Sequence, residues 1–326
     1  MSFITSVIAL LLQWYVWGPL VIVLLYLTWR NYRSIDVIKN VESVLLTLEI
    51  PKTNDKSELA AEQMFASLHG ILRDARELKA NNGYQEHLSF EIASVGGRIQ
   101  FYVWTPKSLQ SFVEGQIYAQ YPQVQIHKAE EDYVAHERHH SVVYTSEITL
   151  TDKEFLPIKT FQSFEVDPLA GITGTLAKLE DTDEEIWIQM LVRPVADSWH
   201  KEADAWIQSV KAGGFNLFGT DGIGKWIAGL FSALWQPPEQ AGATGPELSE
   251  RDKTRISEAE KKATKLGYQV KIRVAYLGER TSDAKLRMQG IIGTFKQFNS
   301  TNLNGFKMSN DSFAKEALAK YKTRLF

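Results

Sequence analysis

Apolar and polar residues alternate in short runs through the first half of the chain, and these runs end at turn signals. Phe90 and Ile92 alternate with polar residues before the Gly96-Gly97 pair, and the alternation resumes after it. A period of two is typical of a half-buried strand, and a glycine pair between two such runs predicts a hairpin. Helical spacing flanks the hairpin, so the expected order is strand, helix, hairpin, helix and strand, at residues 43–51, 57–72, 87–106, 107–121 and 123–127.

The same order of elements is expected a second time in the rest of the chain. These strands and helices are expected at residues 141–150, 167–179, 184–194, 268–278, 282–298 and 304–309. Such an order is that of the split βαβ, or ferredoxin-like, motif. The sequence therefore predicts an α+β fold with two tandem ferredoxin-like modules, in residues 41–135 and 141–326. A helical insertion at about residues 197–267 interrupts the second module.

One part of this insertion carries a continuous apolar face that is rich in tryptophan. Its members recur at the spacing of one side of a helix: Ile223, Trp226, Ile227, Leu230, Phe231, Leu234 and Trp235. Three roles are open for this face: packing on the protein's own sheet, lying on a membrane surface, or docking a partner. The opposite side has few basic residues, which weakens the membrane role.

The N-terminal segment has no charged side chain from Phe3 to Trp29. About 20 apolar residues can cross a bilayer as a helix, so residues 1–40 are expected to form a transmembrane anchor and a juxtamembrane segment. Positive charges follow the apolar run and none precedes it, which predicts a single-pass protein of the bacterial inner membrane with a cytoplasmic C-terminal part. The candidate membrane-interface residues are Trp29, Arg30, Tyr32 and Arg33.

Composition narrows the functional classes. The net charge of -3 provides no large basic field, so no direct nucleic-acid binding is expected. The chain has no cysteine, which excludes disulfides, cysteine nucleophiles and cysteine metal sites. No constellation of residues in the sequence indicates a catalytic centre, a cofactor or a resident metal. The chain is therefore not expected to be an enzyme.

A zinc-protease signature provides the alternative function. His136, Glu137 and His140 have the spacing His-Glu-x-x-His, which on a helix places both imidazoles on one face. The glutamate would then act as general base on a zinc-bound water. However, the segment lies between two predicted strands, and no third ligand is evident in the sequence. A polar connecting loop is therefore favoured over a membrane-bound zinc metalloprotease.

A second motif is similar to a phosphate-binding loop. Gly219, Gly224 and Lys225 have the G-x-x-x-x-G-K spacing, but Trp226 stands where a serine or threonine would hold magnesium. The preceding residues have the pattern of a helix, whereas such a loop follows a buried strand. The sequence therefore predicts no nucleotide binding at this segment.

Several phrases of the chain together resemble the N-terminal region of membrane-anchored ATPases of the type IV secretion or conjugation type, a coupling-protein-like family of small-genome bacteria. They include LSFEIASVGGRIQFYVWTPKSLQSFVEGQIYAQYP, DPLAGITGTLAKL, IWIQMLVRPVADSW and YQVKIRVAYLGER, and the resemblance covers about residues 40–326. In that family this region looks like a preface to a C-terminal motor domain. No position here matches the motor's catalytic residues, so the resemblance implies that the motor is missing or is a separate chain.

These expectations together predict a non-catalytic, membrane-anchored scaffold that positions the ATPase of a translocation machine. The expected partners are the lipid bilayer, further copies of this chain and an ATPase on a separate chain. Contacts between copies are expected through open edges of the predicted sheets. A small-ligand sensor is a third class of function, but no convergent polar cluster in the sequence favours it.

Overall fold

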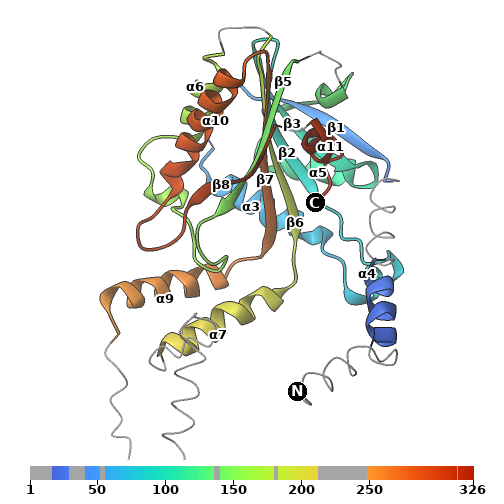
Figure 1. Cartoon of the computed structure of the whole chain (residues 1–326). Coiled ribbons are helices and arrows are strands. Elements are labelled where there is room, and N and C mark those ends of the chain that lie inside the picture. The colour runs from blue at the N-terminus through green and yellow to red at the C-terminus, as the bar shows by residue number, and fades with distance from the viewer. Residues whose placement is uncertain are drawn as a thin grey trace, which may run out of the picture.

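Eight strands form one continuous sheet in the computed structural model, with the strand order β4-β1-β3-β2-β6-β7-β5-β8 (Figure 1). Every pairing in this sheet is antiparallel. The structure describes residues 17–28, 41–51, 56–135, 140–179, 183–211, 248–313 and 315–326. The strands are β1 (Ser43–Glu49), β2 (Leu88–Val95), β3 (Arg98–Pro106), β4 (Gln125–Lys128), β5 (Val142–Leu150), β6 (Glu185–Pro194), β7 (Tyr268–Gly278) and β8 (Phe306–Ser312).

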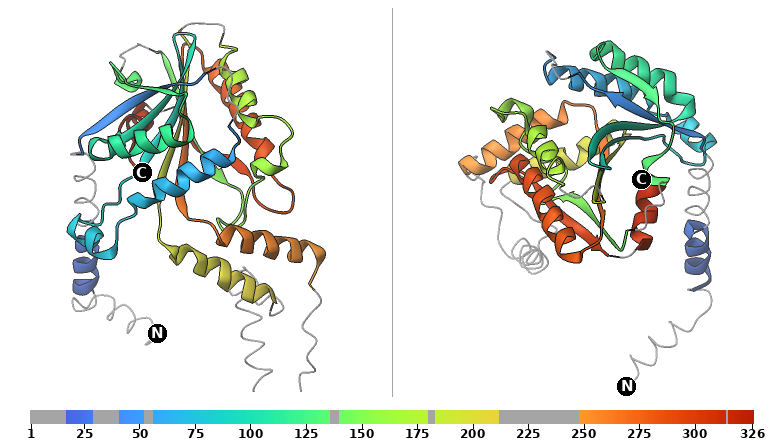
Figure 2. Two further views of the ribbon diagram at one scale, coloured as in Figure 1. Left: turned by 180° about the vertical axis from the view of Figure 1, so that it is seen from behind. Right: turned by 90° about the horizontal axis from the view of Figure 1, so that it is seen from above.

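Four helices cover one face of this sheet, and the last helix of the chain lies on the opposite face (Figure 2). On the first face, α3 and α5 pack on β1 to β4, while α6 and α10 pack on the other half of the sheet. The bounds are α3 (Leu59–Leu68), α4 (Ala75–Ala80), α5 (Gln110–Gln120), α6 (Pro168–Leu176), α10 (Thr281–Phe295) and α11 (Lys315–Lys322). On the opposite face, α11 and the 3-10 turn η3 (Tyr133–Ala135) cover a separate part of the core.

The predicted fold class, two tandem ferredoxin-like modules behind a transmembrane helix, is wrong. Strands and helices occur at most of the expected ranges, but they build a single sheet because β2 pairs with β6. This pairing runs from Leu88 opposite Val192 to Ser94 opposite Ile186. Its seven residue pairs join the two halves of the chain through backbone hydrogen bonds and shared side-chain packing.

The predicted transmembrane anchor is also contradicted. Within the described ranges, the structure contains no helix whose length and apolar character would let it cross a membrane. The expected inner-membrane, single-pass location is corrected accordingly. The candidate interface residues Trp29, Arg30, Tyr32 and Arg33 lie outside the described residues.

Two helices, α7 (His200–Lys211) and α9 (Glu250–Ala263), lie between β6 and β7 in the chain. Figure 1 shows them side by side beyond one end of the sheet. They form a small apolar core of their own, in which Ile207 and Ile256 pack with Phe155 and Leu156 from the segment after β5. The two helices of the insertion therefore pack on the segment after β5, and they are joined in the chain to β6 and β7.

Candidate functional site

A cleft of about 420 Å³, called here the apolar cleft, opens on the helix-covered face of the sheet. Leu48 of β1 and Phe90 of β2 come from the sheet, and Leu169 comes from the first turn of α6. The remaining apolar lining comes from Ile50, Pro51, Met64, Ile117, Tyr121, Pro122 and Val124. The cleft therefore lies where helices of the two halves of the chain face each other. A concave, mostly apolar site of this volume is typical of places that bind a ligand or a partner's side chains.

The mouth of the apolar cleft exposes large apolar side chains to solvent. Ile50 is 46% exposed and Leu169 36%, and Val166, just before the lining residue Asp167, is 76% exposed. Local geometry holds Leu169 in place. The Asp167 carboxylate accepts a hydrogen bond from the Leu169 backbone N–H at 2.8 Å and caps α6, with Pro168 at the first helical position. Leu169 thus projects from a firmly defined helix start, whereas Ile50 follows the end of β1.

The described rim of the apolar cleft is more acidic than basic. Asp167 lines the cleft, and the exposed Glu58 lies near the lining residue Tyr121. Burial raises the pKa of the Tyr121 phenol, and the negative charge of Glu58 adds to this effect, which places Glu58 close to the cleft. Lys56 is the basic residue among the lining side chains that the structure describes. A partner that enters the cleft would therefore meet a net negative rim.

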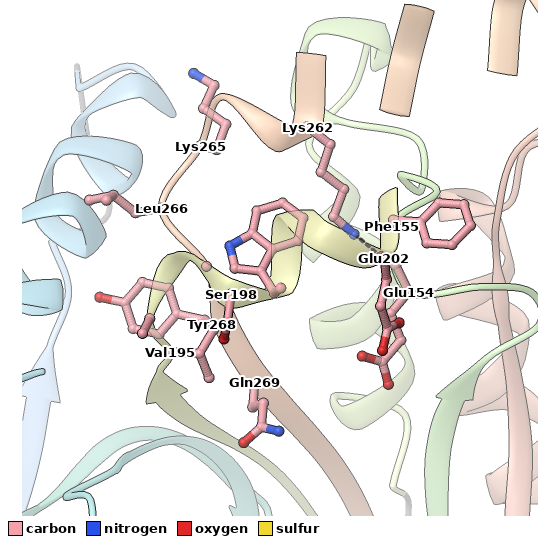
Figure 3. Close-up of a pocket in the computed structure, with 13 residues that line it drawn as sticks. Glu154, Phe155, Val195, Ser198, Glu202, Lys262, Lys265, Leu266, Tyr268 and Gln269 are labelled. Carbon is pink, nitrogen blue, oxygen red and sulfur yellow. Dashed lines mark hydrogen bonds between the residues drawn. The ribbon is translucent and has the colours of Figure 1, made fainter. Parts of the chain in front are cut away.

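A second cavity of about 410 Å³, called here the insertion pocket, lies where α7 and α9 join β6 and β7 (Figure 3). Lys262 lines it from the last turn of α9 and Lys265 from the residues after that helix. Glu202 of α7 and Tyr268 of β7 also line it. The other lining residues are Glu154, Phe155, Val195, Ala196, Ser198, Trp199, Leu266, Gly267 and Gln269. Its walls thus combine aromatic rings with charges of both signs.

The two lysines of the insertion pocket differ in environment. The Lys262 amine donates a hydrogen bond to the backbone carbonyl of Glu154, and burial lowers its pKa while the charge of Glu154 opposes that shift. Lys265, whose side chain is 63% exposed, instead forms an ion pair with Glu62 of α3. Figure 3 shows the Lys262 amine reaching toward Glu154 and Glu202 and the Lys265 amine pointing away from them. Of these two lysines, Lys262 is therefore the one whose amine is desolvated.

The face beneath α11 carries a buried polar cluster, called here the Glu91 network. The Glu91 carboxylate accepts hydrogen bonds from Ser89 at 2.7 Å, Tyr133 at 2.8 Å and Gln189 at 3.0 Å, and also from Arg324. Arg324 also pairs with Asp132 at 2.6 Å. Burial raises the pKa of Tyr133 well above its ordinary value, so this phenol stays a hydrogen-bond donor. These hydrogen bonds to Glu91 all come from side chains of this protein, so the cluster has a structural role: it holds distant segments of the chain together.

The residues proposed as zinc ligands are not brought together in the described structure. His140 is 9% exposed, and its Nε2 lies 3.7 Å from Oε1 of the buried Glu185. His136 and Glu137 lie outside the described residues. In the ranges that the structure covers, no three or more His, Asp and Glu side chains are placed to hold a metal ion. The structure thus adds no support to the protease alternative.

Two other predicted segments also lie outside the described residues. They are the docking-face residues Ile223, Trp226, Ile227, Leu230, Phe231, Leu234 and Trp235, and the loop residues Gly219, Gly224 and Lys225. Sequence reasoning missed the apolar cleft, the insertion pocket and the Glu91 network. Each is assembled from residues far apart in the chain. The sequence offered one signal for the cleft: Ile50 and Leu169 are apolar residues that each stand beside a proline, and both are exposed in the structure.

Residues 37–324 match the family model described as "Domain of unknown function (DUF8128)". The match spans most of the chain, so the protein belongs to this family. The comparison with curated proteins found no match. Neither result indicates secretion or conjugation, so that association rests on the resemblance of the sequence alone.

Among solved structures, the chain is similar to a xylooligosaccharide oxidase from Myceliophthora thermophila C1 in complex with xylobiose. The identity is 11% and the TM-score 0.30, over 87% of this chain and 53% of the oxidase. The chain thus spans about half the length of that protein. We withdraw the expectation that the chain is not an enzyme. At this TM-score the likeness assigns neither a fold nor an activity to the chain.

Proposed function

We propose that this member of the DUF8128 family is a docking protein that holds the ATPase of a type IV secretion or conjugation-type translocation machine. The observation that carries the docking role is the apolar cleft, whose exposed rim residues Ile50 and Leu169 stand beside a concave apolar floor. The resemblance of the sequence supplies the kind of machine. The docking surface belongs to the cleft itself, so the proposal requires no membrane anchor.

The physical basis of docking is burial of apolar surface that is now in contact with water. Burying a leucine- or isoleucine-sized side chain contributes about 1.5–3 kcal/mol, so Ile50 and Leu169 together with one inserted partner side chain could anchor a complex. Interfaces commonly draw most of their affinity from a few such residues seated in pockets. A cleft of about 420 Å³ has room for a small number of side chains from a partner helix or loop.

The charge of the rim indicates the chemistry of the partner segment. Because Asp167 lines the cleft and Glu58 lies near it, the docking segment is expected to carry apolar residues flanked by lysine or arginine. Opposite charges at a rim contribute mainly to the rate of association and to the choice of partner. We therefore propose a basic, amphipathic segment of the ATPase as the occupant of the cleft.

Self-association remains a prediction. The two edge strands of the sheet indicate which surfaces it would use. The edge strand β4 is four residues long and ends at Lys128. The other edge strand, β8, has a break in its register with β5 near Asn310, whose φ is 54°. Short edges, lysines and bulges hinder pairing with another sheet. We therefore expect contacts between copies to use a surface other than these edges.

Affinity purification from the native cells tests the proposed function. The full chain would carry a C-terminal tag, and co-purified proteins would be identified by mass spectrometry. We expect an ATPase to be recovered with the wild-type chain and to be lost with Leu169→Glu or Ile50→Glu. Leu286→Glu is the matched control, because Leu286 is a 65% exposed leucine on α10 outside the cleft lining. Equal recovery with all variants, or recovery of no ATPase by the folded wild-type chain, would contradict the proposal.

A further inference from the structure

We propose that Lys262 is a nucleophilic amine that binds small aldehydes or ketones in the insertion pocket as a Schiff base. This role is independent of docking at the apolar cleft, which lies among different residues. The inference starts from the position of Lys262, which lies in the last turn of α9 and lines a cavity of about 410 Å³.

The geometry presents the Lys262 amine to a bound molecule. Its hydrogen bond goes to the carbonyl oxygen of Glu154, which holds the side chain in one direction and leaves the nitrogen at the cavity wall (Figure 3). Trp199, Tyr268 and Phe155 line the same cavity and offer aromatic surface to an apolar or aromatic ligand. A carbonyl compound that packs on these rings would place its reactive carbon within reach of the amine.

The surroundings increase the uncharged fraction of the Lys262 amine, which is the nucleophilic form. Burial lowers the pKa of Lys262, and the charge of Glu154 only partly opposes this. Within the described residues, no carboxylate forms an ion pair with Lys262, whereas Lys265 is paired with Glu62. Glu202 and Lys265 also line the pocket and add one charge of each sign. Buried lysines with lowered pKa are the ones that proteins use in Schiff-base chemistry.

The proposed step is an addition followed by loss of water. The lone pair of the Lys262 nitrogen forms a bond to the carbonyl carbon, and the π electrons of the C=O bond move to oxygen. The two hydrogens that the neutral amine carried are transferred as protons to this oxygen, which then leaves as water. A C=N bond remains, and hydrolysis reverses each step. No oxidant or reductant takes part.

The alternative role for Lys262 is purely structural, as a clamp between α9 and the segment after β5. A clamp would not make the amine more reactive than an exposed lysine. Lys265 is the internal control, because it lies three residues away, borders the same pocket and is exposed. Lys253, exposed on α9, reports on ordinary surface lysines.

Reductive trapping on the full chain tests the proposal. The protein would be incubated near pH 7 with pyridoxal and sodium cyanoborohydride, and the modified lysines would be located by peptide mass spectrometry over time. We expect Lys262 to be labelled before Lys265 and Lys253, with a rate that saturates as the pyridoxal concentration rises. Lys262→Arg should lose this adduct, keep a donor for the Glu154 carbonyl and leave labelling of Lys265 unchanged.

Two results would overturn the proposal. One is labelling in order of exposure, with Lys265 and Lys253 ahead of Lys262. The other is a labelling rate at Lys262 that rises linearly with pyridoxal, because a linear rate indicates collision without binding in the pocket. Circular dichroism and the thermal midpoint of Lys262→Arg would confirm that the variant is folded, so that loss of its adduct reports on the missing amine.

Discussion

Arg324 forms a buried, two-pronged ion pair with Glu91, in which Nε lies 2.8 Å from Oε1 and Nη2 lies 2.9 Å from Oε2. The two side chains are 3% and 0% exposed. Glu91 lies in the middle of β2, whereas Arg324 follows α11 near the end of the chain and has a φ of 50°, which is uncommon for a residue with a side chain. The ion pair therefore fastens the C-terminal segment to the centre of the sheet.

Replacing Arg324 by alanine is expected to destabilise the protein by about 3–5 kcal/mol, because Glu91 would be left as an uncompensated buried charge. Urea denaturation at pH 7, followed by tryptophan fluorescence, measures this change. Lys107→Ala is the control, since Lys107 and Glu42 form an exposed pair at 2.5 Å with side chains 58% and 73% exposed. Exposed pairs contribute about 0–1 kcal/mol. Similar losses for the two variants would refute the proposed role of the buried pair.

His87 is expected to make the protein less stable in mild acid. Its side chain is buried, Nε2 donates to the Arg324 carbonyl at 2.8 Å, and burial lowers its pKa from 6.5 to about 4. The unfolded chain therefore takes up a proton below about pH 6.5, whereas the folded protein does so only near pH 4. The contribution of neutral His87 to the free energy of unfolding is therefore fully present above pH 6.5. It is lost as the pH falls to about 4, by roughly 3 kcal/mol in total.

His87→Gln tests this dependence, because glutamine keeps an N–H donor and does not titrate. The free energy of unfolding would be measured in urea at several pH values between 7 and 4. We expect the wild-type curve to fall more steeply than that of the variant within this window. Parallel curves would show that His87 does not titrate differently in the folded and unfolded states.

Local features of the fold were accessible from the sequence because they depend on neighbours in the chain. The hairpin between β2 and β3 turns at Gly96 and Gly97, with φ of 56° and 72°, values that glycine adopts without strain. Helix α6 begins after Asp167 for the same kind of reason, since a capping side chain and Pro168 suffice. A strand was also expected at residues 184–194, and β6 lies there; Trp187 and Ile188, on its two faces, are 1% and 5% exposed.

The pairing of β2 with β6, which joins the two halves of the sheet, and the Glu91 network could not be predicted. Both depend on contacts between segments that are distant in the chain. Alternation places Phe90 and Ile92 on one face of β2 and Glu91 on the other, so Glu91 reads as a solvent-facing residue. The structure covers that second face with η3 and α11, a helix that the sequence analysis did not predict. Likewise, an alternating pattern shows which side of β2 is apolar but does not identify β6 as its neighbour.

Gly267 is expected to tolerate no side chain. A Cβ there would lie 2.3 Å from Nε1 and 2.5 Å from Cδ1 of Trp199, and 2.9 Å from Cγ2 of Val195. Gly267→Ala should therefore cost about 1–3 kcal/mol, as overpacking does. Gly174, in the interior of α6, has open space around it, so Gly174→Ala should stabilise the protein by about 0.5–1 kcal/mol. Thermal or urea unfolding of both variants checks the opposite signs, and a stabilised Gly267→Ala protein would contradict the close packing of Trp199.

The two halves of the sheet are expected to unfold together, because β2 and β6 share a ladder and a core. Ile188 on β6 lies opposite Ile92 of β2 and opposite Val274 of β7, and it is 5% exposed. Ile188→Ala should cost about 2–5 kcal/mol and lower the stability of both halves equally. Val270→Ala is the control, because Val270 is a 51% exposed residue of the neighbouring strand β7.

Hydrogen exchange followed by mass spectrometry across a urea series measures the two halves separately in the full chain. Peptides from β1 to β3 report on one half, and peptides from β5, β7 and β8 report on the other. One shared midpoint, shifted equally in both sets by Ile188→Ala, is the expected result, since contiguous cooperative units open together. If the β1 to β3 peptides kept their midpoint while the others shifted, the junction would not couple the halves. The chain would then behave as two units that merely share an edge.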